Sequence, residues 1–172
     1  MQLILENGCG ILDANSYIDI ADVEMDLPST AFEKYQALTP DQQIDRVIIA
    51  SLFIDSSFNW LGKRKTLEQG LSWPRLDIYY QGFEVPDSFI PKQLKRACVM
   101  IVSLINDFGF EILQNTGEAQ VKREKLGPLE TEYFEALKVE YLNSSKFAEI
   151  NNLLRGLYYK PGGVLTAEVI RK

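Results

Sequence analysis

Histidine is absent from the sequence, and cysteine occurs only twice. Without histidine the chain cannot build a Ser-His-Asp or Cys-His catalytic group, and it lacks the ligand that most zinc and non-haem iron sites use. The sequence also contains no GxxxxGK(S/T), GxGxxG or GxSxG motif. Carboxylate pairs such as Glu130/Glu132 and Asp19/Asp22 occur, and an acidic surface face is their commoner role. We therefore expect a protein that is not an enzyme and that holds no metal or other cofactor.

Long apolar runs are missing as well. No run approaches the ~20 residues of a membrane span, and the first residues have neither the basic start nor the apolar length of a signal peptide. We expect synthesis in the cytoplasm and no membrane partner. Cys98 lies in an apolar helical pattern and is interpreted as a small core residue, whereas Cys9 lies between two glycines. A disulfide between them is not expected in a reducing compartment.

The 172-residue chain has the length of one domain, with 46% hydrophobic and 24% charged residues. This composition excludes collagen, coiled-coil rods and wholesale disorder. The net charge of −6 is uneven: residues 1–45 hold nine acidic side chains and one basic, and residues 46–172 hold 15 acidic and 17 basic. A domain that binds duplex DNA is usually basic, because neutralisation of phosphates supplies much of its affinity. The basic residues of this second part occur in three small groups, at 63–65, 92–96 and 122–125. A group of this kind is more often a solvated face than a nucleic-acid contact. Together, however, the three groups carry enough charge for one positive patch.

Apolar spacing and capping signals predict helices over 16–25, 29–36, 40–58, 91–108 and 146–158. The third has the strongest start, because Thr39 can cap it, Pro40 suits its first position and Gln42 completes a Thr-x-x-Gln capping box. The fourth is expected to end at Gly109. The first is expected to be capped by Ser16. The helices over 40–58 and 91–108 are expected to form the core pair.

Extended structure is predicted in a few short segments. Residues 76–85 favour a small hairpin around Gln81-Gly82, and 119–125 favour a charged edge strand before a break at Gly127-Pro128. The fold class is therefore mainly α: a small helical bundle with a short β-hairpin or sheet element and extended N- and C-terminal arms. One domain is expected over 1–160, with residues 1–12 as its N-terminal arm, followed by a tail at 161–172. That tail has two ordinary fates, an edge strand folded back or a strand added to another chain.

The segment 55–75 is the most distinctive part of the chain. It has two interpretations. In the structural one, Trp60 and Trp73 pin an ordered loop against the core pair, and Arg75 stacks on Trp73 or pairs with a carboxylate. In the functional one, the tryptophans are stacking platforms for nucleic acid, and the loop presents Arg75 to the strand together with the DNA-facing cations Lys63, Arg64 and Lys65. Chemistry alone favours the structural interpretation.

The same segment carries a resemblance to a phage family. The shared elements are "W.G", "Q.L.WPR" and a helix-opening "IP", followed by "KLGP". The matching residues here are Trp60, Gly62, Gln69, Trp73, Pro74, Arg75, Ile90 and Pro91, with Lys125-Leu126-Gly127-Pro128 further on. The family is labelled DnaT-like single-stranded-DNA-binding protein, and its members also resemble head-to-tail connector proteins of tailed phages.

As a connector, the chain would be a structural virion protein. The resemblance implies an adaptor, or head-completion protein, that forms a ring of about twelve copies beneath the portal protein. The ring would surround double-stranded DNA in the phage neck and would contact a downstream stopper protein. After synthesis in the host cytoplasm it would reside in the virion. The tail would dock on the portal through Val164, Leu165, Thr166, Ala167, Val169, Ile170 and Arg171. The alternative is a single-stranded-DNA-binding protein that acts in replication or packaging.

Overall fold

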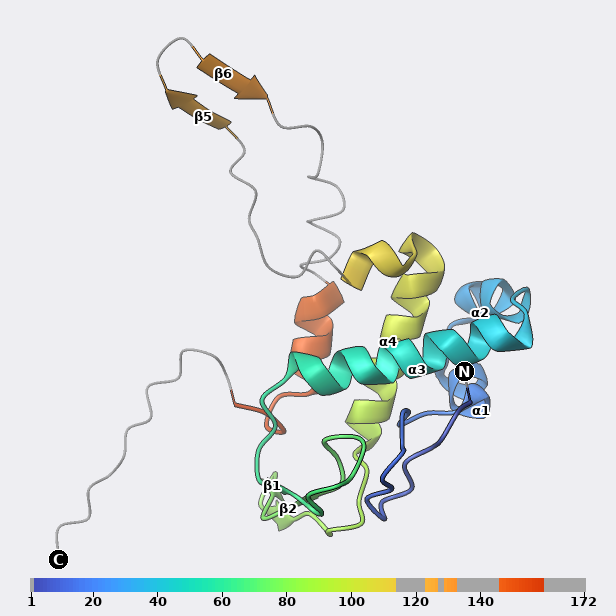
Figure 1. Ribbon diagram of the computed structural model, residues 1–172, viewed down its shortest axis with the longest axis vertical. Helices are drawn as coiled ribbons and strands as arrows, with labels where there is room; N and C mark the ends of the chain where they lie inside the picture. Colours follow the sequence, from blue (N-terminus) through green and yellow to red (C-terminus); the bar gives the residue numbers. More distant parts are fainter. Residues whose placement is uncertain (1, 114–122, 127–128, 133–145, 160–172) are drawn as a thin grey trace, which may run out of the picture.

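Helices dominate the computed structural model, which describes residues 2–113, 123–126, 129–132 and 146–159 (Figure 1). The named helices are α1 (Ile20–Asp26), α2 (Ser29–Gln36), α3 (Pro40–Ser57) and α4 (Lys92–Phe108), and the 3-10 helix η1 (Phe110–Leu113) follows α4. A further helix covers residues 146–153. The prediction of a mainly α fold with a small β element is confirmed. No helix of the described ranges is long and apolar enough to cross a membrane.

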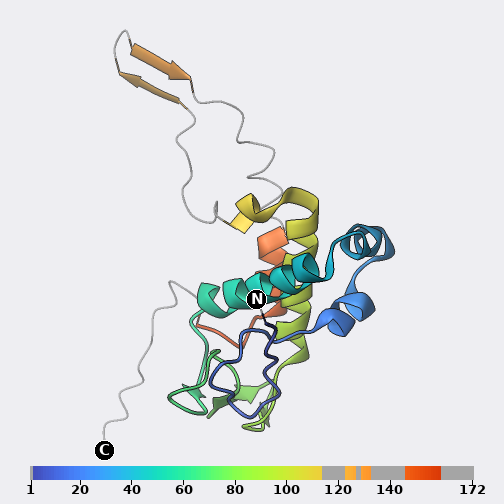
Figure 2. The same ribbon diagram turned by 45° about the vertical axis from the view of Figure 1, so that its right-hand side comes forward.

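The core lies between α3 and α4. Figure 2 shows α3 crossing α4, with α1 and α2 beside one end of α3. Ile54 of α3 and Leu94, Ile101 and Ile105 of α4 belong to this core, and their side chains are essentially inaccessible to solvent. Burial of a side chain of this size contributes about 1.5–3 kcal/mol. The predicted core pair is therefore confirmed.

The capping signals read from the sequence set two of the helix ends. The Thr39 side chain accepts from the Gln42 amide, and the Gln42 side chain accepts from the Thr39 amide, so the predicted capping box starts α3. Gly109 is the C-cap of α4, as expected. The predicted start of the first helix is wrong. Asp19 and Asp22 form the capping box of α1, while the Ser16 hydroxyl is buried against that of Ser51, 2.9 Å away.

The strands of the described residues form three antiparallel pairs. β1 (Lys63–Arg64) pairs with β2 (Arg75–Leu76), and β3 (Tyr79–Tyr80) pairs with β4 (Phe83–Glu84) across Gln81-Gly82, which confirms the predicted hairpin. β5 (Arg123–Leu126) pairs with β6 (Leu129–Glu132), and the predicted break at Gly127-Pro128 lies outside the described residues. Of the predicted edge strand over 119–125, residues 119–122 lie outside the described residues.

The N-terminal segment has no helix or regular strand, and it lies on the body of the protein rather than away from it (Figure 1). Leu5 forms a parallel bridge with Ser16. The buried Glu6 carboxylate accepts from three backbone amides, those of Gly8, Gly10 and Ile11, at 2.8–2.9 Å. These bonds close the segment into a tight loop. The tail at 161–172, with all its predicted docking residues, lies outside the described residues.

Candidate nucleic-acid interface

The two tryptophans of the motif segment are buried. Trp73 is 0% exposed and Trp60 is 6% exposed. Their rings meet edge to face, with centroids 6.0 Å apart, and the Trp60 indole N–H donates to the Asp55 carbonyl at 3.0 Å. A base cannot stack on a ring that solvent does not reach. Both rings therefore belong to the core, and neither is exposed for stacking.

Arg75 ties the motif segment together from within. Its guanidinium donates to the carbonyls of Leu61, Ser72, Trp60 and Gly62, the last at 2.8 Å. Burial lowers the pKa of this guanidinium from its usual value. We expected Arg75 to stack on Trp73 or to pair with a carboxylate. Instead, the N–H groups of its guanidinium donate to backbone carbonyl oxygens, and these bonds hold the side chain in place. Arg75 thus closes a loop and is not available to phosphate.

Gln69 organises the other half of the segment. Its side-chain amide donates to the carbonyls of Leu71 and Pro74, and its oxygen accepts from the Thr66 amide at 2.8 Å. Pro74 is itself buried. The motif residues Gln69, Pro74 and Arg75 therefore share one role, which is to fix the backbone between β1 and β2.

A carboxylate network anchors this segment to the helices. Asp55 of α3 accepts from the Tyr17 hydroxyl and, at 2.8 Å, from the Ser72 amide. The Tyr17 oxygen in turn accepts from the Trp73 amide at 3.0 Å. Burial, and then the charge of Asp55, raise the pKa of the Tyr17 hydroxyl far above its usual value. The hydroxyl therefore stays protonated and keeps its bond to the carboxylate.

The three cations predicted to face DNA have different environments. The Arg64 guanidinium donates to the carbonyls of Gln69 and Leu71, and the Lys65 ammonium donates to the Gly8 carbonyl at 3.0 Å. The Lys63 side chain is 79% exposed and forms an ion pair with Asp77 at 3.0 Å. Lys63 and Arg64 are exposed and Lys65 is half-buried, but the Arg64 and Lys65 side chains donate to backbone carbonyls. The structure thus does not present the three as one basic strip.

The second basic group lies at the start of α4, where Ile90 and the buried Pro91 precede the helix. Here acidic residues of α1 neutralise two of the three cations. Lys95 pairs with Asp22 at 3.1 Å and Arg96 pairs with Asp26 at 3.8 Å. Acids of the N-terminal third thus lie against two bases of this group, while the side chains of the third basic group, 122–125, lie outside the described residues.

Exposed aromatic rings are the feature that sequence reasoning missed. Tyr79 is 67% exposed and Phe83 is 77% exposed, both on the β3–β4 hairpin, and Tyr159 is 55% exposed. β-Propensity predicts the hairpin itself. It does not predict which of the hairpin's rings faces solvent, because strands of only two residues bury little side-chain surface. The signal available was the Gln81-Gly82 turn, since a hairpin at the surface exposes at least one of its faces.

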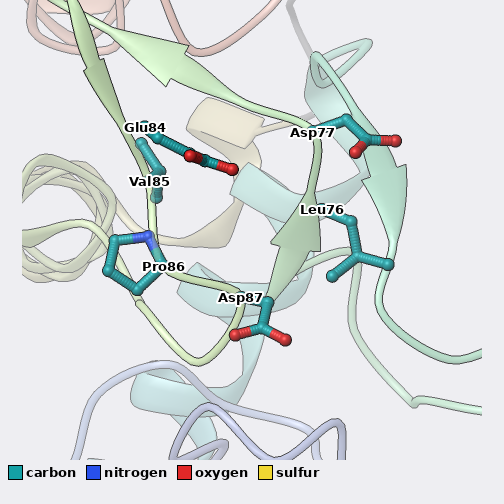
Figure 3. Close-up of a pocket in the computed structure, with 6 residues that line it drawn as sticks. All are labelled: Leu76, Asp77, Glu84, Val85, Pro86 and Asp87. Carbon is teal, nitrogen blue, oxygen red and sulfur yellow. The ribbon is translucent and has the colours of Figure 1, made fainter.

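An open pocket of about 440 Å³ lies beside the hairpin (Figure 3). It is lined by Leu76, Asp77, Glu84, Val85, Pro86 and Asp87. Its three carboxylates make it acidic, and they would repel a phosphate group. Among the residues that the structure describes, no group of three or more acidic or sulfur ligands is placed to hold a metal ion.

The chain belongs to a family described as "Putative DnaT-like ssDNA binding protein", whose model matches residues 1–172. No curated protein and no solved structure matches it. The identification as a head-to-tail connector is therefore wrong. The description of the family that covers the whole chain names single-stranded-DNA binding, and nothing in the match indicates a portal adaptor. The predicted portal and stopper partners, the ring and the location in the virion all depended on that identification.

Proposed function

We propose that this protein binds single-stranded DNA. The observation that carries the proposal is the match of the family model to the entire chain, residues 1–172. It favours the alternative that the sequence left open over the connector. It also agrees with the absence of histidine and of nucleotide-binding motifs, because binding of a strand requires neither.

The charges of the protein define what kind of binding is proposed. The net charge of −6 opposes the approach of a polyanion, and Lys34, Lys63, Lys95 and Arg96 are already in ion pairs. Affinity must then come mainly from stacking of bases on aromatic rings, which is worth about 1–3 kcal/mol per base. A single strand offers open base faces and a duplex does not. We therefore expect a preference for single strands and a weak dependence on salt.

Fluorescence anisotropy with an end-labelled oligothymidine of about 20 nucleotides tests this proposal, with a duplex of equal length as the control. We expect saturable binding to the single strand and binding to the duplex at least about tenfold weaker. One or two phosphate contacts predict a slope of log affinity against log salt of about −0.7 to −1.4. Absence of single-strand binding at about 50 mM salt, or equal affinity for the duplex, would contradict the proposal.

A further inference from the structure

The β3–β4 hairpin has two faces of different chemistry. Tyr80 lies opposite Phe83 and Tyr79 lies opposite Glu84. Residues opposite each other in an antiparallel pair project to the same face, and successive residues alternate between faces. Tyr80 and Phe83 therefore share one face, and Tyr79 and Glu84 share the other.

The face of Tyr79 and Glu84 is unsuited to nucleic acid. Glu84 lines the acidic pocket together with Asp77 and Asp87 (Figure 3). The Lys63 ammonium near this pocket is paired with Asp77. A strand laid along this face would bring its phosphates against carboxylates of the same sign.

The face of Phe83 and Tyr80 meets a different part of the chain. The Tyr80 ring packs against Gly156, and a Cβ atom at that glycine would lie 3.3 Å from the ring. Gly156 is flanked by the exposed Arg155 and is followed by the exposed Tyr159, whose amide donates to the Asn59 carbonyl at 2.7 Å. The contact between Tyr80 and Gly156 thus places the hairpin beside a segment that carries a second exposed ring, Tyr159, and the exposed Arg155, whose guanidinium donates to the Asn152 side chain at 2.8 Å.

The hairpin also holds the Phe83 ring on a defined support. Gln81 and Gly82 have φ values of 51° and 85°, which is the pair of left-handed conformations of a tight two-residue turn matched to strand twist. Tyr80 anchors the ribbon from the same face by its contact with Gly156. A ring presented on a fixed backbone loses little conformational entropy when it binds a ligand. Phe83 is 77% exposed, so its face is open to a base.

We propose that the Phe83 face of the β3–β4 hairpin is where bases of single-stranded DNA stack, with Arg155 as the phosphate partner. This assignment rests on the proposed function. The buried Trp60 and Trp73, which the sequence offers as the obvious aromatic platforms, have no part in it. The site joins a hairpin of the middle of the chain to the segment at 154–159, and it is separate from the acidic pocket.

Two alanine variants on the same hairpin test the assignment. In the anisotropy assay, Phe83→Ala is expected to weaken oligothymidine binding at least about fivefold, which is the lower end of the effect of removing one stacking ring. Tyr79→Ala removes a ring of similar exposure from the acidic face and is expected to change affinity less than about twofold. Both rings are largely exposed, so circular dichroism and melting temperature should match the wild type in each case.

A third variant tests the cation. Arg155→Gln keeps a polar side chain at this exposed position and is expected to make the salt slope shallower by about 0.7, the value of one phosphate contact with a single strand. If the wild type binds and Phe83→Ala binds equally well, or if Tyr79→Ala weakens binding as much as Phe83→Ala, the site is elsewhere while the proposed function stands. If the wild type binds no single strand, both proposals fail.

Discussion

The Tyr17 hydroxyl donates a hydrogen bond to the Asp55 carboxylate, across 38 residues of sequence. The same hydroxyl oxygen accepts from the Trp73 amide, so one phenol joins the segment before α1, the helix α3 and the motif loop. The motif residues of the family thus serve to build the structure. The surface that stays accessible to a ligand near these residues is the outer face of the neighbouring hairpins.

Tyr17→Phe tests the weight of this network. The substitution keeps the buried ring and removes the hydroxyl, which leaves the Trp73 amide without its acceptor and Asp55 without one donor. A buried group deprived of its partner costs about 1–3 kcal/mol, so the free energy of unfolding should fall by that amount. Urea unfolding followed by tryptophan fluorescence measures it. Tyr79→Phe is the control, because Tyr79 is exposed; equal losses in both variants would contradict the network.

Gly62 and Gly82 form a matched pair. Both have positive φ, 70° and 85°, so alanine at either position costs about 1–2 kcal/mol from backbone strain. A Cβ at Gly62 would also lie 2.2 Å from the Leu76 carbonyl oxygen, whereas a Cβ at Gly82 meets nothing within 4 Å. Gly62→Ala should therefore destabilise the protein by at least about 1 kcal/mol more than Gly82→Ala. Thermal unfolding of the two variants decides this, and similar losses would be inconsistent with the close approach at Gly62.

Local signals in the sequence predicted the elements whose cause is local. Thr39 and Gln42 are three residues apart, and Gln81-Gly82 encodes its own turn, so both features could be read directly. The start of α1 could not, because Ser16 bonds to Ser51, 35 residues away, and the cap passes to Asp19. Tertiary contact decided between two residues with similar capping propensity.

The site was harder to predict for a related reason. The oxygens that hold Arg75 are backbone carbonyls, which have no signature in the sequence, so a cation beside a tryptophan resembled a nucleic-acid contact. The exposure of Phe83 follows from the register of two short strands. A one-residue shift in that register would turn the ring to the other face.

Stability should decline in alkaline solution. Burial raises the pKa of the Cys98 thiol to about 12 from an ordinary value of about 9, and burial likewise raises the pKa of the Tyr35 hydroxyl to about 12. Above pH 9 the unfolded chain releases these protons first and binds fewer than the folded chain, so the free energy of unfolding falls as pH rises towards about 12. Urea midpoints at about pH 8, 9 and 10 measure the decline. Cys98→Ala should make it shallower, and a midpoint independent of pH would contradict the assignment.

Tryptophan fluorescence should not change when single-stranded DNA binds. Trp60 and Trp73 are buried, so acrylamide should quench their emission weakly in the folded protein and strongly in urea. Addition of oligothymidine should then leave the emission unchanged under conditions where anisotropy reports binding. Strong quenching by the oligonucleotide would place bases on a tryptophan, against the arrangement described above. Quenching titrations with acrylamide and with oligothymidine, run on the same sample, provide the comparison.

The most direct measurement is the anisotropy titration of the wild-type protein with labelled oligothymidine and with its duplex, at low and moderate salt. We expect binding to the single strand, weaker binding to the duplex and a shallow salt slope, as for an acidic protein that stacks bases and contacts few phosphates. No binding to the single strand at low salt, or a preference for the duplex, would contradict it.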